Sequence, residues 1–166
     1  MKINVDSDIR KAKTISSKFY HSSKIYRKLK KLFDRSWQFI GDTDLLKKNN
    51  AHPGILLEGM VDEPYILTKE NKNIRCLSNV CTHRGNIVCE EACKTKNLVC
   101  GYHGRQFEID GKMKFMPEFD DVKNFPSKDD DLPEISIEIW KNLIFVINDK
   151  RCDLSEVTGP MIERLD

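Results

Sequence analysis

Two short segments of this sequence each combine a cysteine with a histidine, and they restrict the fold more than any other feature. The first loop, residues 81–86, reads Cys-Thr-His-Arg-Gly-Asn, and the second loop, residues 98–104, reads Leu-Val-Cys-Gly-Tyr-His-Gly. As a pattern they give C-x-H, sixteen residues (84 to 99), and C-x-x-H. Two of only four histidines thus lie beside cysteines, and such a local set of thiolates and imidazoles predicts a metal site.

The number of cysteines could instead suggest a disulfide framework. The chain has six: Cys76, Cys81, Cys89, Cys93, Cys100 and Cys152. Disulfide frameworks are typical of short secreted chains, whereas the first eight residues lack the apolar stretch of a secretion signal. We therefore expect a cytoplasmic protein, with Cys76 and Cys152 acting as small apolar residues.

The order of the ligands distinguishes between kinds of site. In a Rieske-type [2Fe-2S] centre one iron takes two cysteines and the other two histidines, so each loop would supply one ligand to each iron. A zinc site usually pairs C-x-x-C with H-x-x-x-H, and a Cys81–Cys100 disulfide would leave both histidines unexplained. We therefore predict a [2Fe-2S] cluster, and glycines that permit tight turns flank its ligands. The predicted ligands are Cys81, His83, Cys100 and His103, and the glycines are Gly85, Gly101 and Gly104.

The wider sequence around these loops resembles the Rieske non-haem iron oxygenases, the α subunits of aromatic ring-hydroxylating systems. Their loops usually read C-x-H-R-G and C-x-Y-H-G-x-x-[FY], which residues 81–85 and 100–107 match. Residues 19–20 and 32–41 resemble the N-terminal lead-in of that family, and residues 107–111 resemble the hairpin after its second loop. The resemblance covers about residues 19 to 148 and implies a Rieske-type antiparallel β domain with a small cluster-binding subdomain.

Short apolar segments separated by turns also predict a mostly β fold. The expected strands are residues 54–60, 64–68, 74–77, 106–110, 112–116, 135–139 and 143–147. We expect three parts: a basic helical N-terminal arm (1–35), the Rieske [2Fe-2S] domain (36–150), and a tail or the start of a missing catalytic domain (151–166).

The basic arm carries ten Lys or Arg between residues 10 and 35, against one acid. Apolar residues at helical spacing predict an amphipathic helix over residues 23–35. We interpret it as a helix laid on its own domain or on a neighbour with its lysines in water; a membrane-surface helix and a nucleic-acid arm are the alternatives. The net charge of +2 and the lack of a long apolar run favour neither nucleic acid nor membrane as a general partner.

Residues 118–134 are acidic, with seven Asp or Glu against two Lys. We interpret them as a solvated surface loop, with a docking surface for a basic partner or for the chain's own basic arm as the alternative. Cys89 and Cys93 lie between the two loops at a spacing that allows one turn of helix, and a role as cluster ligands is not expected.

The resemblance implies a function as well as a fold. In such oxygenases this domain relays single electrons from a reductase or ferredoxin to a mononuclear iron, held by two histidines and one carboxylate in a larger domain. In these oxygenases the mononuclear iron often belongs to the neighbouring subunit of a trimer. The resemblance implies that His103 would face a carboxylate that bridges the two metal centres. Besides the two predicted cluster ligands, this chain has only His21 and His52, and neither lies in a motif that could hold such a mononuclear iron. His52 is expected in a loop.

We therefore expect an oxidoreductase component that does not hydroxylate a substrate alone, as a fragment or a truncated homologue. A stand-alone Rieske ferredoxin and a zinc-stabilised interaction module are the alternatives.

The resemblance also separates this chain from the Rieske proteins of cytochrome complexes. Those have a disulfide between the loops and a Ser and a Tyr that donate hydrogen bonds to cluster sulfur. Asn86, Tyr102, Arg105 and Phe107 stand at the corresponding positions here. Fewer donors predict a potential in the lower part of the range of about −150 to +300 mV. Arg84, Tyr102 and Arg105 flank the ligands and would serve in docking, in packing or in backbone hydrogen bonding.

Overall fold

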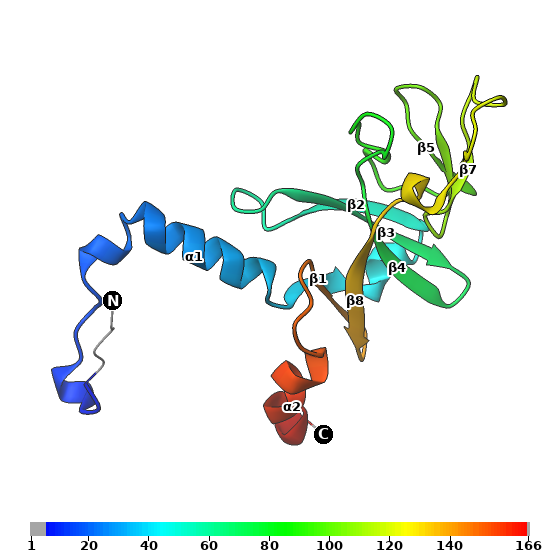
Figure 1. Cartoon of the computed structure of the whole chain (residues 1–166). Coiled ribbons are helices and arrows are strands. Elements are labelled where there is room, and N and C mark those ends of the chain that lie inside the picture. Colours follow the sequence, from blue (N-terminus) through cyan, green and yellow to red (C-terminus); the bar gives the residue numbers. More distant parts are fainter. Residues whose placement is uncertain (1–5, 166) are drawn as a thin grey trace.

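The structure is a computed structural model that describes residues 6–165. Within these residues the chain forms nine strands and two α-helices, α1 (Ser23–Asp34) and α2 (Leu154–Leu165), with short 3₁₀ turns (Figure 1). The strands are β1 (Gln38–Asp42), β2 (Ala51–Leu56), β3 (Glu63–Glu70), β4 (Asn73–Ser78), β5 (Asn97–Val99), β6 (Gln106–Glu108), β7 (Met113–Phe115), β8 (Glu134–Trp140) and β9 (Leu143–Ile147). The expected mostly antiparallel β fold is confirmed, because every strand pair is antiparallel.

Two sheets divide the domain into a base and a tip. Six strands form the larger sheet in the order β1-β9-β8-β4-β3-β2, and β5-β6-β7 form the smaller one. The first predicted loop follows β4 of the large sheet, whereas the second lies between β5 and β6 of the small one. The two sheets therefore bring together the two loops, which residues 87–97 separate in the sequence.

The two sheets pack around two apolar clusters. One cluster lies beneath the two loops and includes Phe107, Ile66 and Leu77, all fully buried. The other, with Leu67 and Val146, fills the base of the large sheet. Side chains of β3 and β4 enter both clusters, because alternate residues of a strand face opposite sides of the sheet.

Several predicted boundaries were wrong. The strand expected at residues 54–60 is β2, which begins at Ala51 and ends at Leu56, so His52 lies in a strand opposite Leu67 rather than in a loop. The expected hairpin at residues 106–116 has shorter strands, β6 and β7, and their pairing contains a register shift between Gln106 and Phe107. Strands β1 and β5 were missed, and α2 occupies the segment that was predicted as a tail or the start of a missing catalytic domain.

Helix α1 extends away from the sheets, as Figure 1 shows. The Ser22 side chain caps its N-terminus through the Ile25 N–H, and none of its residues is buried. It contacts the domain at its C-terminal end, where Arg35 pairs with Asp149 at 2.8 Å, and at Tyr26, whose hydroxyl donates to the Gly59 carbonyl at 3.3 Å. The helix predicted at residues 23–35 is thus confirmed, but none of its apolar residues is buried against this domain.

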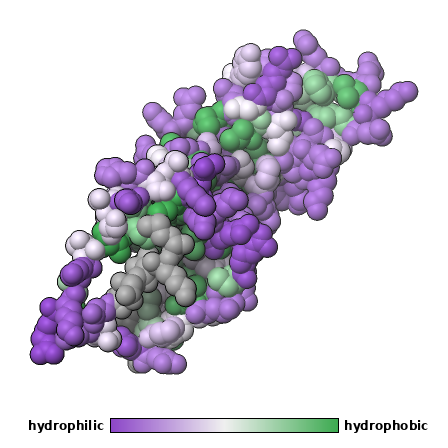
Figure 2. Space-filling model, turned by 60° about the vertical axis from the view of Figure 1, so that its left-hand side comes forward, coloured by the Kyte–Doolittle hydropathy of each residue, from purple (hydrophilic) through white to green (hydrophobic). Residues whose placement is uncertain are grey.

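The side of the molecule seen in Figure 2 is mostly hydrophilic, with hydrophobic patches between the charged side chains. In residues 6–165 no helix has the length and apolar character needed to cross a membrane.

Candidate metal centre

The two predicted loops have the same backbone hydrogen bonds. The Cys81 N–H donates to the Asn86 carbonyl (2.8 Å), and the Gly85 N–H donates back to the Cys81 carbonyl (2.9 Å). In the second loop the Cys100 N–H donates to the Arg105 carbonyl (2.8 Å), and the Gly104 N–H donates to the Cys100 carbonyl (3.0 Å). Each cysteine therefore begins a closed turn of the same size.

Two glycines make these turns possible. Gly85 has φ of 73° and Gly104 has φ of 72°, the left-handed region that side chains with a Cβ adopt at a cost. A Cβ at Gly104 would also lie 3.3 Å from Cγ of Pro117, whereas a Cβ at Gly85 would meet open space. Gly101, which was predicted to have the same role, does not have a positive φ.

The two thiols lie together beneath the surface. Cys81 and Cys100 are 3% and 2% exposed, and their side chains lie next to each other. Burial raises the pKa of the Cys81 thiol, although the N–H groups of His83 and Arg84 point at its sulfur. Burial also raises the pKa of the Cys100 thiol, but hydrogen bonds from the N–H groups of Tyr102 and His103, and from the side chains of Cys81 and Asn86, lower that pKa overall.

These donors fit thiolates that bind iron. In each loop the N–H groups two and three residues after the cysteine point at the sulfur, and Nδ2 of Asn86 lies 3.7 Å from Sγ of Cys100. Backbone and side-chain donors of this kind stabilise ligand sulfur and tune the potential of a cluster.

The two imidazoles form a second pair. The ring centroids of His83 and His103 are 4.9 Å apart, and their planes are inclined by 72°. Burial, with His103 and two nearby arginines, lowers the pKa of His83 and so favours the neutral imidazole that metals bind. The exposed ring of Tyr102 lies over the His103 ring, with 3.8 Å between the ring centroids. The Phe119 ring lies edge-on to the His83 ring, with 6.2 Å between the centroids.

The four predicted ligands are therefore sorted by kind, thiol with thiol and imidazole with imidazole. Among residues 6–165 there is no group of three or more His, Cys, Asp or Glu side chains arranged around a single ion. A two-iron cluster needs two ligand pairs, one for each iron, and the chemistry of this donor set fits that requirement.

Arg105 lies behind the second loop. Of the three residues that flank the ligands, Arg105 is buried and packs inside the domain, whereas Arg84 and Tyr102 are exposed. Its guanidinium donates to Oγ1 of Thr82 (3.0 Å) and to the carboxylate of Asp130. Thr82 donates in turn to the Asp130 carbonyl (2.7 Å), which connects both loops to the acidic segment.

The interpretation of residues 118–134 as a solvated loop was thus partly wrong. Asp130 accepts hydrogen bonds from the N–H and hydroxyl of Ser127, and Phe119 and Phe125 pack on the core beneath the loops. Burial raises the pKa of Asp130, but its bonds to Ser127 and Arg105 lower that pKa overall. Sequence reasoning missed this role because one aspartate in an acidic run carries no distinguishing signal.

The remaining candidates lie elsewhere. Cys89 and Cys93 face each other outside the ligand set, in a segment that is not helical. The carbonyl of Cys152 accepts a hydrogen bond from Nε1 of Trp37 (3.1 Å). Of the other histidines, His21 lies in the N-terminal arm and His52 in β2.

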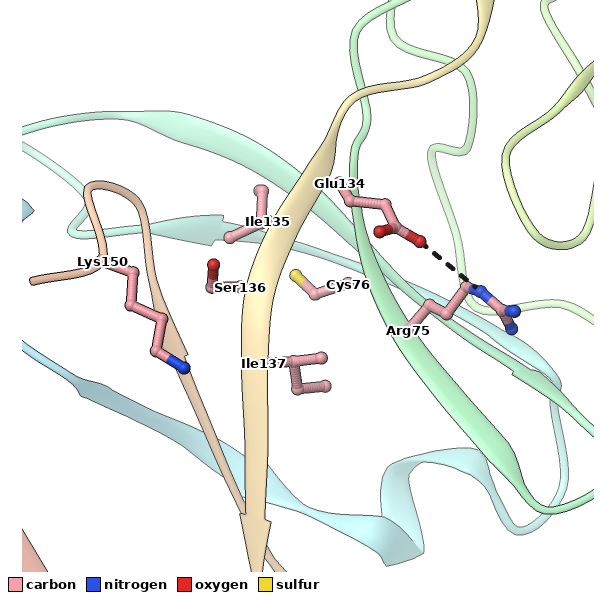
Figure 3. Close-up of a pocket in the computed structure, with 7 residues that line it drawn as sticks. All are labelled: Arg75, Cys76, Glu134, Ile135, Ser136, Ile137 and Lys150. Carbon is pink, nitrogen blue, oxygen red and sulfur yellow. Dashed lines mark ion pairs between the residues drawn. The ribbon is translucent and has the colours of Figure 1, made fainter. Parts of the chain in front are cut away.

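A pocket of about 420 Å³ lies between β4 and β8, away from both loops (Figure 3). An ion pair between Arg75 and Glu134 (3.6 Å) closes one side of it. Burial raises the pKa of Cys76 in its wall to about 12, so this thiol stays protonated at neutral pH. The pocket therefore offers no thiolate to a metal.

Comparison with known proteins agrees with the site. Residues 36–126 match the Rieske [2Fe-2S] domain. The carnitine monooxygenase oxygenase subunit of Acinetobacter baumannii is 26% identical over 156 residues, which are 92% of this chain and 42% of that protein. The chain thus spans about two fifths of the length of this curated relative.

Solved oxygenases share the fold. A quaternary ammonium Rieske monooxygenase, CntA, superposes with a TM-score of 0.80 at 24% identity, covering 93% of this chain and 45% of that one. Naphthalene 1,2-dioxygenase from Rhodococcus sp. superposes with a TM-score of 0.77 at 21% identity, covering 89% and 34%.

Proposed function

This chain belongs to the Rieske [2Fe-2S] domain family, and we propose that it relays single electrons to a mononuclear iron site of an oxygenase. The resemblance seen in the two loops is confirmed, and so is the class of cofactor. The observation that carries the proposal is the sorting of the ligands into a thiol pair and an imidazole pair.

Cys81 and Cys100 would hold one iron, and His83 and His103 the other. When bound, a [2Fe-2S] cluster accepts and releases one electron at a time. The backbone N–H groups aimed at each cysteine sulfur would stabilise the thiolates, and the lowered pKa of His83 keeps a lone pair available for the metal.

The exposure of the ligands suggests the side from which electrons pass. Both cysteines are buried, whereas both histidines are only partly covered and the neighbouring Tyr102 is 59% exposed. A redox partner would therefore approach the imidazole pair, because the loops present that pair to the surface. Tyr102 and Arg84 would be the first side chains that such a partner meets.

The partners in this proposal are a reductase or ferredoxin that donates electrons and a catalytic domain that receives them. The relatives are monooxygenases and dioxygenases of greater length. One solved quaternary ammonium Rieske monooxygenase is described with inter-subunit electron transfer. The acceptor iron would thus lie in a longer form of this protein or in a neighbouring subunit of a homotrimer.

The test begins with the protein purified without air, then oxidised and analysed for iron and sulfide. About two irons and two sulfides per chain, with the absorption of an iron–sulfur protein, are expected. His103→Ala should lose the cluster, whereas the matched variant His52→Ala in β2 should retain it. A colourless protein with one zinc would contradict the proposal.

A redox titration tests the second part of the proposal. Because the donors to sulfur seen here are backbone N–H groups and one amide, we expect a potential in the lower part of the Rieske range. A value above roughly +200 mV would argue against delivery of electrons from a nicotinamide-fed reductase.

A further inference from the structure

Cys89 and Cys93 form a pair of thiols that the proposed electron relay does not use. The two side chains lie next to each other, and the Cys89 thiol donates a hydrogen bond to the Glu91 carbonyl at 3.2 Å. Cys89 is buried in the core beneath the loops, and Cys93 packs against that core from a half-buried position. Both are free cysteines.

The backbone holds each member of the pair in place. Cys89 exchanges two hydrogen bonds with the buried side chain of Asn79, at 2.9 and 2.7 Å. Cys93 exchanges two with the backbone of Ala51 in β2, at 3.0 and 3.1 Å. Little chain entropy is therefore lost when the two sulfurs are joined, because both ends are already positioned.

The pair is open to a small reagent. A pocket of about 270 Å³ is lined by both cysteines together with Glu90, Glu91 and Thr95, among others. Residues 90–92 between the two cysteines are exposed, so this short connection can adjust when the sulfurs approach bonding distance.

We propose that Cys89 and Cys93 are a dithiol site that a low-molecular-weight disulfide, such as oxidised glutathione, converts to an intrachain disulfide. The Cys93 thiolate attacks one sulfur of the reagent, and the first glutathione thiolate leaves. The Cys89 thiolate then attacks the Cys93 sulfur of the mixed disulfide and displaces the second glutathione. Two cysteine thiols are oxidised, one glutathione disulfide is reduced, and the two protons pass to the departing thiolates.

The order of attack follows from exposure. Cys93 is the more accessible thiol, whereas burial, aided by the nearby Cys93, raises the pKa of Cys89 to about 12. Cys89 is thus the slow partner, which reacts only when the adjacent sulfur has become part of a disulfide.

The experiment uses the full chain with its metal centre loaded, so that Cys81 and Cys100 do not compete. Protein is incubated with oxidised glutathione, free thiols are blocked with iodoacetamide, and peptides are mapped by mass spectrometry. We expect a Cys89–Cys93 linkage in the wild type. Cys89→Ser should instead retain glutathione on Cys93, because the second thiol is missing.

Cys152→Ser is the matched control and should leave the linkage unchanged. The proposal is overturned if the wild type retains glutathione on Cys93 to the same extent as Cys89→Ser. It is equally overturned if both cysteines remain free and are alkylated as in untreated protein. None of these outcomes depends on the route of electrons through the metal centre.

Discussion

Arg105, directly after the second loop, donates a hydrogen bond to the carboxylate of Asp130, which lies twenty-five residues further along the chain. The guanidinium also lies near the rings of Phe107 and Phe125, at 5.9 and 5.6 Å from their centroids. One buried cation thus connects the second loop, the first loop through Thr82, and the acidic segment. The relative position of the two ligand-bearing loops depends on this residue.

Removal of the Asp130 charge is therefore expected to destabilise the domain. Asp130→Asn leaves the Arg105 cation buried with a weaker acceptor, at a cost of about 2 kcal/mol in the free energy of unfolding. Urea denaturation measures this loss in the free energy of unfolding. Asp129→Asn, an exposed neighbour in the same turn, should change stability by less than about 0.5 kcal/mol.

Acid should reduce the difference between wild type and Asp130→Asn. Because the folded pKa of Asp130 is lowered, its contribution is fully present above the unfolded value of about 3.9 and is lost as pH falls through the folded value. Denaturation curves at pH 7 and at about pH 3 measure the change. An equal stability difference at both pH values would mean that the carboxylate charge does not stabilise the fold.

The two loop glycines offer a matched pair of substitutions. Gly85→Ala should cost about 1 kcal/mol, since only the left-handed backbone opposes a side chain there. Gly104→Ala should cost about 2 kcal/mol, because its Cβ must also displace Pro117. Thermal unfolding of both variants measures the order, and a more severe effect at Gly85 would contradict this account.

Asn86 is expected to tune the potential of the proposed cluster. Its amide donates toward Sγ of Cys100, and a donor to ligand sulfur favours the reduced state. Asn86→Ala should lower the midpoint potential by about 40 mV, the equivalent of roughly 1 kcal/mol. Asn148→Ala, whose amide bonds Asp34 at 2.9 Å, should leave the potential unchanged in the same titration.

The lack of burial in α1 predicts a contrast between two leucines. Leu67→Ala removes a fully buried side chain and should cost about 3 kcal/mol. Leu32→Ala in α1, where the side chain is 59% exposed, should change the free energy of unfolding by less than about 0.5 kcal/mol. A large effect at Leu32 would show that this face of the helix is covered in solution.

Much of the fold could be predicted because the signals are local. The apolar run of β9 and the alternation in β8 gave the correct strands, and helical spacing gave α1. Three elements lacked such signals. β5 has only three residues, Gly159 and Pro160 are weak helix formers inside α2, and β1 depends on pairing with the distant β9.

The sequence by itself determined which side chains could hold the cofactor, because cysteine and histidine spacing is a chemical pattern that needs no coordinates. Only the tertiary structure decided how they are arranged: thiols paired and buried, imidazoles paired and partly open, and both loops tied to Asp130. It also decided the contact of Cys89 with Cys93. The physical reason is that burial and long-range pairing depend on all the packed elements at once, whereas ligand type depends on each residue alone.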